Sequence, residues 1–111
     1  MSQEITFDDF TKVDLRVGTI LEVNEFPKAR NPSYQLVVDF GELGIKKSSA
    51  QITSLYSKEA LINKQVVAVL NFPIKQIANF KSECLILGAV DAKDVILLSP
   101  EKRIQNGSTV A

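Results

Sequence analysis

Hydrophobic and polar residues alternate along two long segments in the first half of the chain. In residues 13–24 and again in residues 34–40, apolar side chains gather on one face of an extended chain. A period of two is typical of a strand with one buried face. We therefore predict two strands, with Gly18 as a bend or bulge in the first. The apolar faces are formed by Leu15, Val17, Leu21 and Val23, and then by Tyr34, Leu36, Val38 and Phe40.

The rest of the pattern predicts three more strands and a helix. Residues 45–52 read as a polar third strand, and residues 54–62 as a short helix capped by Thr53. Residues 65–72 are almost continuously apolar, which predicts a fourth strand with both faces covered. Residues 83–90 read as a fifth strand. A mostly β chain of five strands, with a helix between the third and fourth, has the arrangement of an OB-fold barrel.

The remaining segments connect or flank this barrel. Residues 6–10 predict a short capped helical turn, with Phe7 and Phe10 facing inward. Residues 74–81 read as a connecting segment, and residues 91–94 as a turn into a last short strand at 95–98. The order of elements therefore predicts a single domain over residues 1–111.

The amino-acid composition restricts the possible functions more than it restricts the possible folds. The chain has no histidine, a single cysteine and 13 acidic residues against 13 basic ones. Without histidine, the commonest general base and metal ligand are missing, and we expect neither an enzyme nor a bound metal or cofactor. Cys84 lies in a strand-like run, so we predict a buried, unreactive thiol. No run predicts membrane insertion and the N-terminus lacks a secretion signal, so we expect a cytoplasmic protein.

Short polar side chains and cations gather at the ends of the later strands. Ser49 and Gln51 are two residues apart and so share a face, while Lys75 and Ser82 flank the segment after the fourth strand. These elements converge on one rim of an OB barrel, where ligands of such barrels typically lie. Phe80, between Asn79 and Lys81, is the predicted exposed aromatic, and Phe72 is predicted to be core. The predicted ligand-binding residues are Arg16, Lys28, Arg30, Lys46, Lys47, Ser49, Gln51, Asn71, Lys75, Phe80 and Ser82.

Several segments resemble a known family when taken in order. Residues 14–20, Asp-Leu-Arg-Val-Gly-Thr-Ile, resemble the opening strand of the tRNA-binding domain found at the C-terminus of bacterial methionyl-tRNA synthetases. Later segments resemble the CsaA branch of that family, which comprises export-associated, chaperone-like proteins. Ser49-Ala50 stands where the synthetase-type domain carries Ser-Gly, and this difference also fits the CsaA branch. The segments that carry the resemblance to this branch include 26–30, 34–36, 39–41, 46–53, 71–73, 75–80, 82–83 and 87–88.

The resemblance implies an OB-fold homodimer without catalytic activity, whose N- and C-terminal extensions form the dimer interface. It leaves two functions open. One is a chaperone that binds unfolded or presecretory polypeptides and is linked to protein export. The other is a protein that binds tRNA as a structured RNA. The zero net charge favours the first, because phosphate binding usually needs a basic protein, whereas the fold's relatives favour the second.

Overall fold

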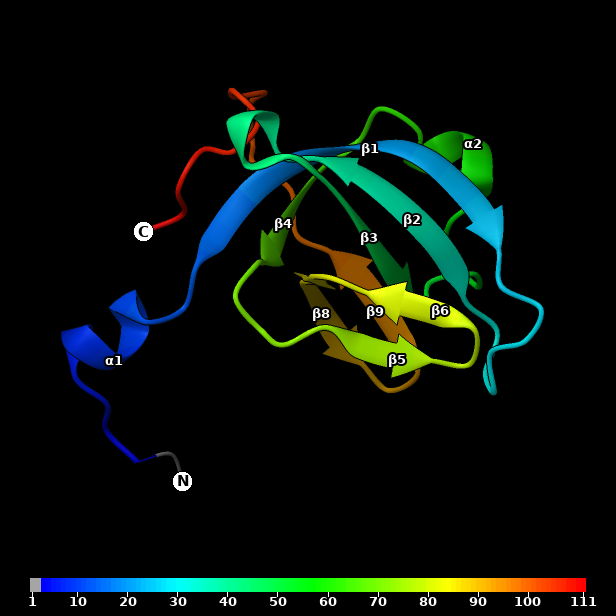
Figure 1. The fold of residues 1–111 in the computed structure, drawn as a ribbon, viewed down its shortest axis with the longest axis horizontal. Coiled ribbons are helices and arrows are strands. Elements are labelled where there is room, and N and C mark those ends of the chain that lie inside the picture. The colour runs from blue at the N-terminus through cyan, green and yellow to red at the C-terminus, as the bar shows by residue number, and fades with distance from the viewer. Residues whose placement is uncertain (1–2) are drawn as a thin grey trace.

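Five strands form one antiparallel sheet that curls into a nearly closed barrel in the computed structural model, which describes residues 3–111 (Figure 1). Their order across the sheet is β3-β2-β1-β4-β7, and every neighbouring pair is antiparallel. This arrangement confirms the predicted OB-fold barrel. The strands are β1 (Leu15–Glu25), β2 (Tyr34–Asp39), β3 (Ile45–Ala50), β4 (Gln65–Val69) and β7 (Leu85–Ile86).

Short helices and two small hairpins complete the described part of the chain. The helix α2 lies between β3 and β4, as predicted, and a 3₁₀ turn, η1, joins β2 to β3. The two hairpins, β5–β6 and β8–β9, form separate two-stranded sheets. The bounds are α1 (Phe7–Thr11), η1 (Gly41–Leu43), α2 (Lys58–Leu61), β5 (Lys75–Ile77), β6 (Phe80–Ser82), β8 (Gly88–Asp91) and β9 (Asp94–Leu97).

The barrel interior is filled by the apolar faces that the alternating pattern predicts. All four predicted apolar side chains of β2 are buried, and Leu36, Val38 and Phe40 are wholly so. Leu61 of α2 and Val66 of β4 join the same cluster, so the short helix covers one end of the barrel. Every side chain from Gln65 to Leu70 is buried or half-buried, which confirms that β4 is covered on both faces.

The structure corrects the expectation for β1. Ile20 pairs with Val38 and Glu22 with Val37, so Leu21 is an extra residue on the bulged strand. Because a one-residue shift exchanges the faces of a strand, Leu21 is exposed, not buried as predicted. Gly18 lies before the bulge and has another role. A Cβ atom there would lie 2.6 Å from Cε1 of Phe40, so glycine is what lets Phe40 pack against β1.

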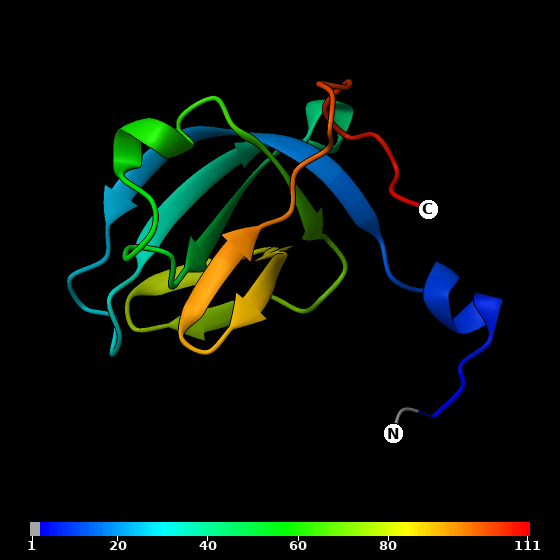
Figure 2. The same ribbon diagram turned by 180° about the vertical axis from the view of Figure 1, so that it is seen from behind.

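The N-terminal turn is also corrected. The capping of α1 is confirmed, because the Thr6 hydroxyl accepts a hydrogen bond from the Asp9 main-chain N–H at 3.1 Å. However, α1 lies away from the barrel in both views (Figures 1 and 2), and the side chain of Phe7 is 75% exposed. Its ring lies 6.3 Å from the ring of Phe10, so the two aromatics pack on each other and not on the core.

Three other boundaries differ from the prediction. The helix begins after Ser57, whose hydroxyl accepts a hydrogen bond from Ala60 N–H, and not after Thr53. Residues 74–81 contribute to the β5–β6 hairpin and are not a simple connection. The expected fifth strand divides into β7 and β8. The division follows from β4, since Val67 bonds to both Leu87 and Leu98 and leaves no place for β8.

The C-terminal tail, residues 104–110, runs along the first half of β1, which β2 does not reach. The N–H of Gly107 donates to the C=O of Val17 at 2.7 Å, and the N–H of Val17 donates to the C=O of Ser108 at 3.0 Å. The amide side chain of Gln65 donates to the C=O of Ile104 at 2.7 Å and accepts from its N–H at 3.0 Å. The tail is therefore built into the sheet.

Candidate functional site: a groove at the seam of the barrel

The barrel closes where β3 meets the residues just before β7, and we call this line of contact the seam. The N–H of Glu83 donates to the C=O of Lys47 at 2.8 Å, and the N–H of Lys47 donates to the Glu83 carboxylate at 2.8 Å. The buried hydroxyl of Ser48 donates to the C=O of Cys84 at 2.8 Å. These bonds take the place of a regular ladder, because β3 and β7 are not hydrogen-bonded neighbours in the sheet.

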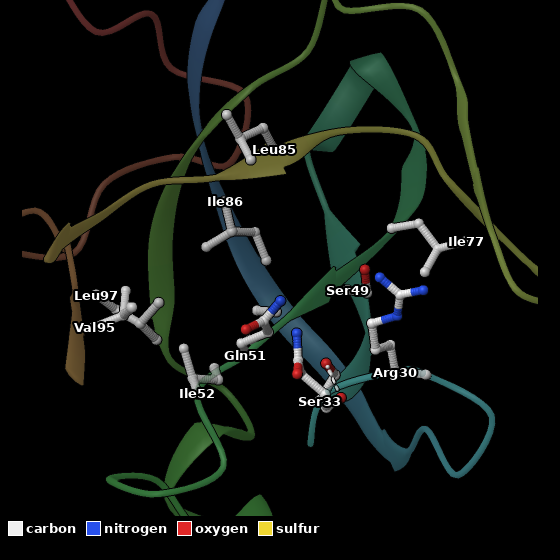
Figure 3. Close-up of a pocket in the computed structure, with 13 residues that line it drawn as sticks. Arg30, Ser33, Ser49, Gln51, Ile52, Ile77, Leu85, Ile86, Val95 and Leu97 are labelled. Atoms are coloured by element: carbon white, nitrogen blue, oxygen red, sulfur yellow. Dashed lines mark hydrogen bonds between the residues drawn. The ribbon is translucent and has the colours of Figure 1, made fainter. Parts of the chain in front are cut away.

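Past these bonds the seam opens into a groove of about 400 Å³, which we call the seam groove (Figure 3). Residues 49–52 form one side of it, and the two residues of β7 with part of β9 form the other. In Figure 3, Arg30, Ser49 and Ile77 lie on one side of Gln51, and Val95 lies on the other. The groove therefore combines polar groups along β3 with apolar side chains opposite.

A smaller hollow of about 150 Å³, the side hollow, adjoins the seam groove. It is lined by Phe72, Pro73, Lys75, Ser82, Cys84 and Leu85. Leu85 lines both spaces, so this one side chain borders the groove and the hollow. Because Lys75 pairs with Ser82 across the β5–β6 hairpin, the hairpin fixes both groups at the same point of the hollow.

The structure brings five of the predicted ligand-binding residues to these two spaces. Arg30, Ser49 and Gln51 line the seam groove, and Lys75 and Ser82 line the side hollow. Ser49 and Gln51 were expected to share a face of the third strand, but β3 ends at Ala50, so Gln51 lies just beyond it. Both nevertheless line the groove. That these residues bind a ligand stays a prediction.

Three predicted cations lie beside the spaces without lining them. Lys28 is exposed on the loop that also carries Arg30. Lys46 and Lys47 precede Ser49 on β3, and the main chain of Lys47 helps to close the seam. None of the three side chains lines either space.

Two predicted residues are used elsewhere. The side chain of Arg16 pairs with Asp14 at 2.6 Å and donates to the C=O of Gly107 at 3.0 Å, so it holds the tail on β1. The amide of Asn71 donates to the C=O of Lys12 at 2.6 Å and accepts from the N–H of Asp14 at 2.9 Å. Both residues serve the fold in these positions, away from the seam groove.

The expectation for the two aromatics is reversed. Phe80 is only 9% exposed, because its ring packs on Phe26 at a centroid distance of 5.3 Å. Phe72 is 55% exposed and lines the side hollow. The reason is that β4 ends at Val69, so Phe72 lies beyond the strand and outside the core.

Cys84 is buried beside the seam, as predicted. Burial raises the pKa of its thiol to about 11. A thiol needs to lose its proton to act as a nucleophile, so this side chain is almost wholly protonated at neutral pH. Its Sγ lies 3.8 Å from the C=O of Lys47, within the closed part of the seam.

The apolar half of the seam groove was missed from the sequence. Leu85, Ile86, Val95 and Leu97 line it, although the pattern places them in ordinary core strands. Leu85 and Ile86 come just before the break in the expected fifth strand, whereas Val95 and Leu97 belong to β9, which follows it. No local residue marks that break. Ile77 of the β5–β6 hairpin lines the groove as well.

Within residues 3–111 the structure contains no cluster of three or more potential metal-ligating side chains. No helix in this range has both the length and the apolar character needed to cross a bilayer. The chemistry available at the groove is recognition through hydrogen bonds, one guanidinium group and apolar contact.

Comparison with known proteins agrees with this picture. Residues 15–109 match the family described as "Putative tRNA binding domain". The crystal structure of the chaperone CsaA from Bacillus anthracis is 51% identical and superposes with a TM-score of 0.94, over 98% of this chain and 100% of that one. The CsaA chaperone of Picrophilus torridus is also 51% identical, with a TM-score of 0.92, over 97% and 100% of the two chains.

Relatives also include much longer proteins. The methionine–tRNA ligase of Pyrococcus abyssi is 38% identical over 106 residues, which is 96% of this chain but 14% of the ligase. The matched structures are those of chaperones and the matched family is a binding domain, and neither is a catalytic domain. The chain therefore belongs to the putative tRNA binding domain family, and within that family it is of the CsaA type.

Proposed function

We propose that the protein is a non-enzymatic chaperone that binds unfolded polypeptides in the seam groove. The observation that carries this proposal is the composition of the groove. One side of the groove carries aliphatic side chains such as Ile86 and Val95, and the facing side carries the polar groups of Ser49 and Gln51. An unfolded chain offers the matching surface, namely apolar side chains at intervals along a hydrogen-bonding backbone. Solved chaperones of 51% identity support the same assignment.

The lining of the groove also favours a polypeptide over RNA. Proteins that bind unpaired bases usually stack them on aromatic rings, and none of the side chains from residues 3–111 that line the seam groove is aromatic. Arg30 is the one charged side chain in that lining, which is little for a phosphate backbone.

A second candidate, tRNA binding, is favoured by a different observation. Phe72 is exposed next to Lys75 in the side hollow, and this pairing of a ring with a cation suits base stacking beside a phosphate. The family description points the same way. Binding at the side hollow would leave the seam groove free.

Leu85→Asp tests the proposal. Leu85 is 47% exposed, so we expect the variant to fold. Because Leu85 lines both spaces, the aspartate places a charge against an apolar ligand. We expect binding of a reduced and alkylated, permanently unfolded protein to weaken by at least about tenfold. Fluorescence anisotropy of the labelled substrate measures this effect. The matched control is Leu55→Asp, since Leu55 is also 47% exposed and lines neither space.

A gel shift with total tRNA over a salt series completes the comparison. Binding of tRNA with a steep salt dependence, together with no binding of the unfolded protein, would replace the proposed function by the second candidate. Equal binding of the unfolded protein by both variants and the wild type would show that the seam groove is not the site.

The homodimer belongs to the proposal too. The described N-terminal residues expose Ile5, Phe7 and Val13 on a segment that stands off the barrel, and a partner chain would cover them (Figure 2). We expect sedimentation to show a particle of twice the 12.3 kDa chain mass at micromolar concentration. Phe7→Asp is expected to shift this particle towards the monomer. Val90→Asp is the control, because the Val90 side chain on the β8–β9 hairpin is 72% exposed, close to the value for Phe7. A wild-type monomer at these concentrations would contradict the proposal.

Three further parts of the proposal rest on the resemblance to CsaA-type proteins. The protein binds presecretory polypeptides and is thereby linked to protein export. It acts in the cytoplasm, and it needs no cofactor. The domain as a whole, residues 1–111, acts as one unit in this proposal.

A further inference from the structure

The seam groove lies at the edge of β3 and not on either of its faces. Alternate side chains of a strand point to opposite faces, yet the last two residues of β3, Ser49 and Ala50, both line the groove. The two residues that follow the strand, Gln51 and Ile52, line it as well. β3 is also the last strand of the five-stranded sheet, with β2 as its one neighbour there. A ligand in the groove therefore meets the main chain of β3 as well as its side chains.

The direction of the main-chain groups follows from the bonds at the seam. Both the N–H and the C=O of Lys47 point away from β2, since they bond to Glu83. Residues two apart in a strand direct their main-chain groups to the same side. The N–H and C=O of Ser49 therefore point away from β2 as well, into the groove.

The opposite side of the groove has the same property. The C=O of Cys84 points towards β3, because it accepts the hydroxyl hydrogen of Ser48. The N–H of Leu87 donates to the C=O of Val67 at 2.9 Å, so Leu87 faces β4. Consecutive residues of a strand face opposite sides, so the main-chain groups of Ile86 point away from β4, into the groove. The groove is thus a gap in the barrel wall with main-chain donors and acceptors on both sides.

The geometry points to strand addition as the mode of ligand binding: an extended polypeptide segment lies in the seam groove and pairs with the open edge of β3 at Ser49. This inference rests on the proposed function and specifies how the ligand is held. Unpaired strand edges are templates for another extended chain. The added segment would continue the sheet and bridge the gap towards Ile86.

The lining also specifies the ligand's sequence pattern. Side chains of the added segment that point into the barrel meet Ile52, Val95 and Leu97, so apolar residues fit at alternate positions. Arg30 is the one charged lining group among the described residues, and an acidic side chain pointing outward complements it. The fitting ligand is an alternating apolar and polar or acidic segment, without a run of basic residues.

N-methylated peptides test the inference on the unmodified protein. The probe is a labelled eight-residue peptide of alternating valine and threonine with one aspartate. Methylation of the amide nitrogens at one set of alternate residues removes the donors that face β3 and adds bulk at that edge. We expect one of the two alternate sets to weaken binding by at least about tenfold, measured by fluorescence anisotropy.

Proline substitution in β3 is the complementary test. Ser49→Pro removes the N–H that faces the groove, and a strand edge whose N–H is not used in the sheet tolerates proline. The matched control is Ile45→Pro. Ile45 is at the start of β3, directs its N–H to the same edge, is exposed and does not line the groove. We expect Ser49→Pro to weaken binding of the unmethylated peptide by at least about tenfold, and Ile45→Pro to leave it within about twofold.

The outcomes separate this inference from the function on which it rests. If the wild-type protein binds the peptide, but both methylated sets and Ser49→Pro bind it equally well, strand addition is wrong and the proposed function stands. If the wild type binds neither this peptide nor an unfolded protein, the proposed function fails, and the inference fails with it. Thermal unfolding of both proline variants verifies that each is folded at the assay temperature.

Discussion

Replacing Phe40 by alanine is expected to lower the free energy of unfolding by about 3–5 kcal/mol. Phe40 is wholly buried at the end of β2, and its ring fills the space above Gly18 of β1. Truncation removes the transfer free energy of the ring and leaves a cavity that the barrel wall does not collapse to fill. Urea unfolding followed by circular dichroism measures the loss.

A double-mutant cycle with Gly18→Ala tests whether this contact is the cause. The added methyl group would lie 2.6 Å from Cε1 of Phe40 and 2.7 Å from Cγ1 of Val38, so the single change is expected to cost about 1–3 kcal/mol by overpacking. With Phe40 already replaced by alanine, the main clash is gone and the methyl group enters the cavity. The double variant should therefore be more stable than the sum of the two losses implies. Simple additivity would show that Gly18 and Phe40 are not coupled.

Replacing Gln65 by leucine is expected to cost about 3 kcal/mol and to release the C-terminal tail. The buried amide makes two hydrogen bonds to Ile104 and donates to the Oδ1 atom of Asn106 at 3.1 Å. Asn106 is in turn bonded by the Thr19 hydroxyl at 2.6 Å. Leucine keeps the volume but removes every one of the Gln65 bonds. Urea unfolding gives the stability loss, and the rate of tryptic cleavage after Arg103 reports release of the tail.

The control for this change is Gln105→Leu, the same substitution one residue before Asn106. The Gln105 side chain is exposed, so its loss should cost less than about 0.5 kcal/mol and leave cleavage at Arg103 slow. Similar stability loss and cleavage in the two variants would mean that Gln65 does not anchor the tail.

The sequence predicts best those strands in which the pattern of apolar residues matches the faces that the sheet buries. β2 and β4 begin at the predicted residues. The alternation in β2 reflects its one buried face, and the continuous apolar run in β4 reflects burial of both faces. Leu21 shows the limit of this reasoning. The bulge that exposes it is fixed by the pairing of β1 with β2, which no residue of β1 marks on its own.

The candidate site divides in the same way. Ser49 and Gln51 stand out in the sequence because polar side chains interrupt a strand, and both line the seam groove. Asn71 is equally polar, yet its side chain hydrogen-bonds to the main chain of residues 12 and 14, which are 57 or more positions away in the sequence. Phe80 is buried by Phe26, which lies on a loop far from it in sequence. Such distant partners cannot be inferred from a local pattern.

The closed part of the seam has a consequence for the range of polypeptides that the proposed site would accept. Much of the barrel wall is held by longer ladders, such as the six residue pairs between β2 and β3. The seam is held at Lys47, Ser48 and their partners alone among the described residues, without a regular ladder. Local opening of the seam would widen the seam groove while the ladders between the strands stay intact. A groove of adjustable width would discriminate little between thin and bulky segments. Such tolerance would suit the proposed binding of unfolded polypeptides, which share a backbone and little else.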